Sequence, residues 1–200
     1  MHKFFSSLYD ASVYLQQPEQ NTGRDEIIEV GKLYYGDTKD IYRALIKFDI
    51  AKVSASFVEY NITDSWKAYL NLKSSKAEEI PLEYTIHANA VSQSWTMGIG
   101  TKFDNITSEG VSWKYRDGIN SWQDNTVGGT AFYVAGTTGS ANAEGGTWYT
   151  GSEASQSYSY DDDDVRMNVT DILKMWLSGS VPNNGFVVRH GLSNDEDTID

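Results

Sequence analysis

The sequence predicts an all-β protein built from antiparallel strands, with one short α-helix. Two observations predict this class. Many short segments alternate apolar with polar residues, and the composition favours strands, with 13 tyrosines and 7 phenylalanines but only 3 prolines. Alternation with a period of two turns one face of a strand toward a core and the other toward solvent, which is typical of antiparallel sheets.

Five strands are expected in the first half of the chain. The clearest is Arg43–Ile50, where every second residue from Ala44 onward is apolar, while Arg43, Lys47 and Asp49 lie on the opposite face. The five expected strands, in chain order, are Ala11–Leu15, Glu26–Leu33, Arg43–Ile50, Trp66–Lys73 and Glu83–Ala90.

Three further strands are expected in the second half, at Thr130–Gly136, Thr147–Thr150 and Gly185–Arg189. Clusters of Gly, Asn, Asp and Ser separate these segments from one another and mark turns. The predicted pattern is therefore a series of short strands joined by turns.

One segment has helical spacing instead. In Val169–Trp176 apolar residues fall at i, i+3, i+4 and i+7, which places them along one face of a short amphipathic helix. Asn168 or Thr170 is placed to cap its start, and Gly179 lies just beyond its end. We expect this helix to pack on a sheet.

Length and composition set the domain organisation and exclude some partners. Residues 1–200 are expected to form a single β-sandwich domain, with a long Gly/Ser/Thr-rich excursion at 136–164. A net charge of −12 argues against a nucleic-acid partner, and no apolar run is long enough for a transmembrane helix. The chain has no cysteine, and its N-terminal residues do not have the pattern of a signal peptide, so a non-secreted protein is expected.

Three stretches carry a resemblance to a known family. They are DASVYLQQPEQNTGRDEIIEVG (residues 10–31), YRALIKFDI (42–50) and VRMNVTDILKMWLSGSVPNNGFVVR (165–189). Together they resemble the DNRLRE type of β-sandwich, a jelly roll similar to carbohydrate-binding modules. The turn from Asn21 to Glu29 is similar to versions of this domain found in bacteriophage virion proteins. The resemblance implies a jelly-roll fold and a structural role, because none of these stretches is a catalytic signature.

The same resemblance implies roles for the tryptophans. Trp95 and Trp113, in a pattern where one tryptophan precedes a Val-Ser-Trp strand, are expected in the core. Trp122 and Trp148 stand among polar residues and glycines, so they either fold back over the sandwich or contact a glycan or a partner. Tyr115 is the third candidate for such a contact.

Other candidate chemistry is sparse. The acidic run Asp161, Asp162, Asp163 and Asp164 has the oxygen ligands that Ca²⁺ prefers, so it is the one candidate for a structural calcium site. Adjacent aspartates alternate outward along an extended chain, however, which favours a solvated acidic turn; no other cofactor is expected. The three histidines have no zinc-binding spacing, His87 is expected to face solvent, and no catalytic motif is present, so we do not expect an enzyme.

Two functions remain open at this point. The first is a bacteriophage virion structural protein, a head, neck or tail decoration or accessory subunit that assembles with other virion proteins or with copies of itself. The second is a carbohydrate-binding module of an adhesin or of a host-glycan-binding protein, which requires an exposed aromatic surface. The expected location is the virion.

Overall fold

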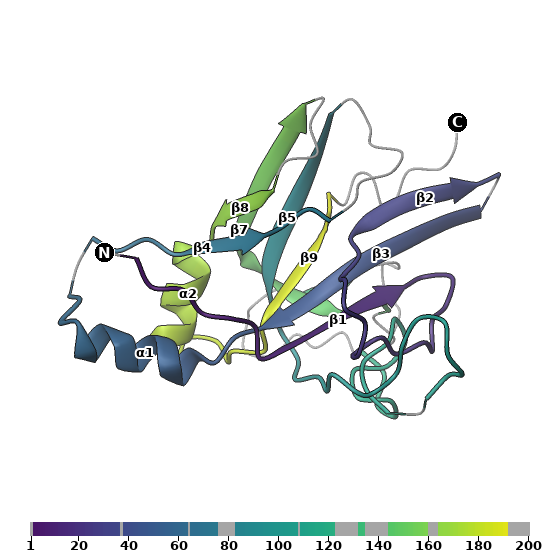
Figure 1. The fold of residues 1–200 in the computed structure, drawn as a ribbon, viewed down its shortest axis with the longest axis horizontal. Helices are drawn as coiled ribbons and strands as arrows, with labels where there is room; N and C mark the ends of the chain where they lie inside the picture. The colour runs from purple at the N-terminus through teal and green to yellow at the C-terminus, as the bar shows by residue number, and fades with distance from the viewer. Residues whose placement is uncertain are drawn as a thin grey trace.

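The computed structural model describes residues 2–36, 38–63, 65–75, 83–107, 109–122, 132–134, 144–159 and 164–191. This part of the chain is mostly β, with nine strands in antiparallel sheets and two helices (Figure 1). The predicted all-β class is therefore confirmed, and the expectation of a single helix is wrong.

Seven of the described strands form one sheet, in the order β1-β3-β9-β5-β7-β6, with β2 also paired to β3. β1 pairs with the second half of β3 along one edge. Along the other edge the first half of β3 pairs with β2 and the second half with β9, so Tyr42 has a partner on each side, Tyr14 of β1 and Gly31 of β2 (Figure 1). Strand β9 also pairs with β5 and so joins the two halves of the sheet. The strands are β1 (Tyr9–Tyr14), β2 (Gly31–Tyr35), β3 (Thr38–Lys47), β5 (Glu83–Val91), β6 (Phe132–Val134), β7 (Thr147–Ser159) and β9 (Phe186–His190).

One face of this sheet is covered by regular structure. Strands β4 (Tyr69–Leu72) and β8 (Val165–Asn168) form a two-stranded sheet, and helix α2 (Thr170–Leu177) follows β8 directly. The apolar side chains of β4, β8 and α2 pack against those of the large sheet, and the ring of Trp176 meets the ring of Phe186 edge to face with centroids 4.6 Å apart. The core on this face follows from the predicted alternation and from the predicted amphipathic helix.

The opposite face is covered by loops. The described residues 92–107 and 109–122 cross it with no regular strand, and they bring Trp95, Val111, Trp113 and Trp122 against Leu45 and Val187 of the sheet. Because both faces are covered, β3 is buried on both sides, and even Arg43 is 1% exposed. The predicted solvent-facing side of this strand is therefore a second core.

The second helix, α1 (Ile50–Glu59), replaces the expected end of a strand. Strand β3 stops at Lys47, and the Asp49 carboxylate accepts hydrogen bonds from the backbone N–H groups of Ala51 and Lys52, which caps the helix. Ile50 therefore begins a helix instead of ending the predicted strand Arg43–Ile50.

Other boundaries also differ from the predictions. Strand β2 begins at Gly31 rather than at Glu26, and β7 continues to Ser159, so much of the expected excursion at 136–164 belongs to the large sheet. Helix α2 confirms the predicted helix. Asn168 accepts a hydrogen bond from the backbone of Thr170 at 3.1 Å, and Gly179 follows the helix with a φ of +73°.

Candidate functional site

The tryptophans proposed as surface contacts lie in the core. Trp122 and Trp148 are both 0% exposed, and the Trp122 indole N–H donates a hydrogen bond to the backbone carbonyl of Ser112 at 3.1 Å. Trp95 and Trp113 are buried as predicted. A fully covered indole cannot stack on a sugar, so of the two alternatives for Trp122 and Trp148 their burial favours rings folded back into the protein.

Trp148 lies between two buried arginines. The guanidinium carbon of Arg189 lies 4.8 Å from the Trp148 ring centre, and that of Arg43 lies 5.3 Å from it. Arg43 also stacks on Trp113 at 4.6 Å and donates a hydrogen bond to the carbonyl of Gly145 at 3.0 Å. Planar guanidinium groups stack well on indoles, so these arginines extend the aromatic core.

A polar network lies beside this stack. Arg189 donates to the side-chain oxygens of Asn89 at 2.9 Å and Glu153 at 2.8 Å, and Nδ1 of His87 lies 2.7 Å from the second Glu153 oxygen. The side chain of His87 is 19% exposed, so it is partly buried rather than fully facing solvent as predicted. The Glu153 carboxylate thus balances the charge of the buried Arg189. A buried charge is stable only when it has such a partner.

Tyr115 is the one predicted contact aromatic that keeps some exposed surface. Its backbone N–H donates to the Ser112 hydroxyl, its carbonyl accepts from the Ser112 N–H, and the Lys114 ammonium lies 5.0 Å from its ring centre. It therefore belongs to a tight turn. The three predicted contact aromatics do not form an exposed pair.

The loop after Trp95 is held in place by Asn21, which is 0% exposed. Its side-chain amide donates to the carbonyls of Met97 at 2.7 Å and Val111 at 2.8 Å, and its oxygen accepts from the N–H of Gly100 at 2.7 Å. Asn21 thus replaces a strand partner for a segment that has none. The Asn-Thr-Gly stretch found in the sequence is a structural link between distant loops.

Lys102 forms a second link to the same loop. Its ammonium group pairs with both oxygens of Glu29, at 2.7 and 2.9 Å, and lies 4.4 Å from the ring centre of Tyr14. Its backbone N–H donates to the Asp25 carboxylate at 3.2 Å, and burial raises the pKa of Asp25. Burial and the Glu29 charge also raise the pKa of Tyr14. The loop is thus fixed by both backbone and side-chain contacts.

Above these links the loop presents an apolar surface, the tip loop (residues 99–106). Phe103 is 91% exposed, Ile106 is 62% and Ile99 is 52%. Ile27, on the segment that carries Asp25 and Glu29, is 57% exposed. Single exposed apolar residues are common, but several on one firmly held loop suggest an interaction site.

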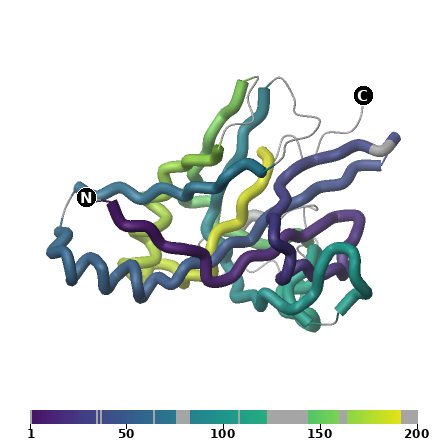
Figure 2. Tube along the Cα trace, viewed as in Figure 1, coloured from purple at the N-terminus to yellow at the C-terminus, as the bar shows by residue number. Residues whose placement is uncertain are grey.

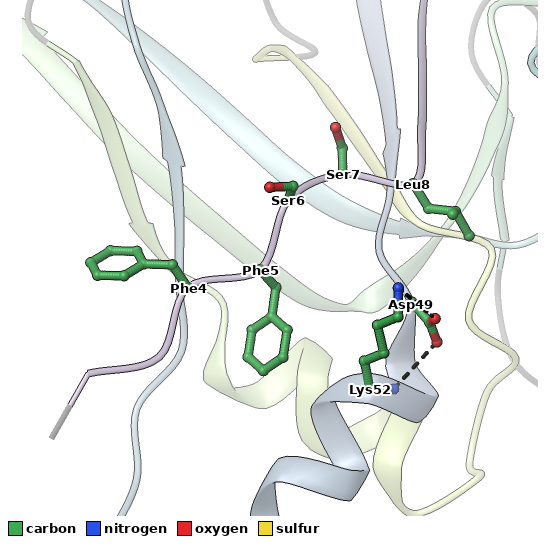
Figure 3. Close-up of a pocket in the computed structure, with 7 residues that line it drawn as sticks. All are labelled: Phe4, Phe5, Ser6, Ser7, Leu8, Asp49 and Lys52. Carbon is green, nitrogen blue, oxygen red and sulfur yellow. Dashed lines mark hydrogen bonds and ion pairs between the residues drawn. The ribbon is translucent and has the colours of Figure 1, made fainter.

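A second apolar feature lies where residues 2–8, the N-terminal arm, run beside α1. Arm residues 4–8 line a pocket of about 300 Å³ with Asp49 and Lys52, and we call it the arm pocket (Figure 3). The arm is attached by the hydrogen bond from the Leu8 N–H to the Lys47 carbonyl at 2.7 Å. Figure 3 shows the ring of Phe5 directed toward the helices and that of Phe4 turned away from them.

The acidic run is only partly described. Asp161, Asp162 and Asp163 lie outside the described residues, so the calcium prediction stays a prediction for them. Asp164 pairs with the Lys73 ammonium and accepts from the Ser74 N–H at 2.9 Å, and the hydrogen bond from Lys73 lowers its pKa. Within the described ranges no group of three or more His, Asp or Glu side chains is placed to hold a metal ion.

Sequence reasoning missed both the tip loop and the arm pocket. The stretch GIGTKFDNIT around the tip has no alternating period, so its apolar residues gave no sign of whether they were buried. The pocket depends on where α1 lies, and α1 was not predicted. The signal that existed was Asp49 followed by Ile50, Val53 and Phe57 at helical spacing.

The N-terminal arm lies on the side of α1, and the teal loops that follow β5, which include the tip loop, lie toward the other end of the long axis (Figure 2). In the part of the chain that the structure describes, no helix is long and apolar enough to span a membrane. No protein-family model matches this chain, and no curated protein matches its sequence.

Proposed function

We propose that this protein is a structural subunit of a bacteriophage virion, a head, neck or tail accessory component that acts through protein–protein contacts and catalyses no reaction. The observation that carries the proposal is the tip loop, in which large apolar side chains are exposed on a backbone fixed by Asn21 and Lys102. Exposed apolar groups on a rigid scaffold suit a contact surface, because little conformational entropy is lost when they dock.

The jelly-roll topology and the relationship to DNRLRE-type domains belong to the same proposal. They are supported by the sequence resemblance of residues 10–31, 42–50 and 165–189. The mostly β, antiparallel architecture is compatible with both. In this reading the buried tryptophans and arginines stiffen the subunit, and its loops make the contacts.

The carbohydrate-binding alternative loses its main support. It required an exposed aromatic pair from among Trp122, Trp148 and Tyr115. Both tryptophans are fully buried, and Tyr115 alone keeps some exposed surface. A panel of glycans is therefore expected to leave the tryptophan fluorescence of the protein unchanged. Saturable quenching by one class of sugar would restore this alternative.

Mass spectrometry of particles purified from the source of the protein tests the virion role. We expect the protein at a fixed stoichiometry to capsid or tail proteins, and we expect that ratio to survive a density gradient. A protein found only in the particle-free fraction would refute the virion role, whatever its own state of association.

A further inference from the structure

We propose that the protein associates with itself head to tail, with the tip loop of one copy docked into the arm pocket of the next. This inference deepens the proposed function and rests on it for its biological setting, since it names the partner as a second copy of the same chain. The contact joins an exposed apolar projection to a pocket lined in part by apolar side chains.

The tip loop has the properties of a preformed anchor. Phe103 is 91% exposed, and Ile106 and Ile99 lie on the same short loop. The backbone of Met97, Gly100 and Lys102 is held by hydrogen bonds to Asn21 and Asp25, so the start of the loop has a fixed position. Aromatic anchors presented in this way often contribute most of the binding energy of an interface.

The arm pocket has the size and lining to accept such an anchor. Its volume is about 300 Å³, and an apolar cavity of about 150 Å³ is enough to hold a benzene molecule. Phe4, Phe5 and Leu8 supply apolar lining, and Ser6 and Ser7 supply hydroxyl groups at its edge (Figure 3). The phenyl ring of Phe103 therefore fits the available space.

Charge favours this pairing over contact between two tip loops. Residues 23–29 and 99–109 carry five carboxylates (Asp25, Glu26, Glu29, Asp104 and Glu109) but only two cations. At the pocket the Lys52 ammonium pairs with the Asp49 carboxylate at 3.7 Å, and the Lys52 side chain is 74% exposed. Two tip loops would bring like charges together, whereas the paired charges at the arm pocket do not repel a tip loop.

The placement of the two surfaces makes the contact a head-to-tail one. The N-terminal arm and the loops that carry the tip lie on different sides of the molecule along its long axis, so one copy can offer both to two neighbours at once (Figure 2). A contact between two different surfaces closes into a ring if the rotation between copies permits, and otherwise continues as a filament. Rings and filaments are the forms that an accessory subunit of a particle can use.

Variants that remove one surface at a time test the proposal. Phe103→Asp removes the anchor, and Ser6→Trp fills the pocket; both residues are exposed, so the fold is expected to persist, and circular dichroism checks this. Ile119→Asp is the matched control, because Ile119 is 79% exposed but lies outside the tip loop. Sedimentation velocity is measured for each protein from micromolar to millimolar concentrations.

We expect the mass of the wild-type protein and of Ile119→Asp to rise with concentration. Phe103→Asp and Ser6→Trp should each associate at least about thirty-fold more weakly. An equal mixture of these two variants should form a dimer that does not grow, because each variant keeps one of the two surfaces. This mixture separates head-to-tail contact from symmetric contact.

Three results would overturn the proposal: a wild-type protein that stays monomeric throughout, association of Phe103→Asp equal to that of the wild type, or no dimer in the mixture. The outcome is independent of the virion test. Self-association without particle incorporation would refute the proposed function alone. Particle incorporation without self-association would refute this inference alone.

Discussion

Replacement of Asn21 by alanine is expected to destabilise the protein by about 3 to 5 kcal/mol. The side chain is fully buried and makes three hydrogen bonds of 2.7 to 2.8 Å to the backbone of residues 97–111. Each buried hydrogen bond contributes about 1 kcal/mol, and each backbone group left without a partner costs about 1 to 3 kcal/mol unless water enters. The expected loss is a large part of the roughly 5 to 15 kcal/mol that stabilises a domain.

Urea unfolding followed by tryptophan fluorescence measures this loss. With a dependence of about 2 to 3 kcal/mol per molar urea, the midpoint should fall by about 1 to 2 M. Asn105→Ala is the control, because Asn105 is an exposed asparagine on the same loop, and it should change stability by less than about 0.5 kcal/mol. If Asn21→Ala behaved like Asn105→Ala, the structural role assigned to Asn21 would be refuted.

Three further substitutions, one of them with a matched control, test other parts of the structure. Trp148→Ala should cost about 3 to 5 kcal/mol in the same unfolding assay, since the ring is fully buried, and a loss below about 1 kcal/mol would contradict that burial. Gly98→Ala should lower the free energy of unfolding by at least about 2 kcal/mol, because Gly98 has a φ of +81° and an added methyl group would overlap Asn21. Gly36→Ala is its control: Gly36 has a φ of +63° but lies in open space, so the loss should be only about 1 kcal/mol. Asp25→Asn should stabilise the protein at neutral pH, because burial raises the pKa of Asp25 in the folded state above its ordinary value of 3.8. The unfolded wild type loses this proton near pH 3.8 and the folded wild type only at higher pH, so the wild type loses stability between these two pH values. The gain should disappear when unfolding is measured below that ordinary value, and an equal gain at both pH values would contradict the assignment.

Local patterns in the sequence predicted the β class, most strands and α2, but they did not predict what covers each face. Arg43 alternates with apolar neighbours and was placed on a solvent face, yet its guanidinium stacks on Trp113 and Trp148. That burial depends on Gly145, 102 residues further along the chain, to which Arg43 donates a hydrogen bond. No local pattern records a contact at such a distance.

The wrong prediction at the start of α1 and the open alternative for Trp122 have separate physical causes. The period-two pattern of β3 continues through Phe48 and Ile50, so the start of α1 looked like the end of a strand, although Asp49 was already placed to cap a helix. Polar residues flank Trp122 and left its burial open, but its indole N–H finds the Ser112 carbonyl inside the protein. Buried tryptophan needs only one hydrogen-bond acceptor, which a loop backbone readily supplies.

The position of β9 in the large sheet has a consequence for how the chain folds. β9 is the last described strand along the chain, but it lies between β3 and β5 and pairs with both. During synthesis on the ribosome, the strands that precede it can therefore form two separate groups, β1-β2-β3 and β5-β6-β7, with no strand to join them. Contacts between such distant segments form slowly, so the final step of folding should be the insertion of β9 between two preassembled halves.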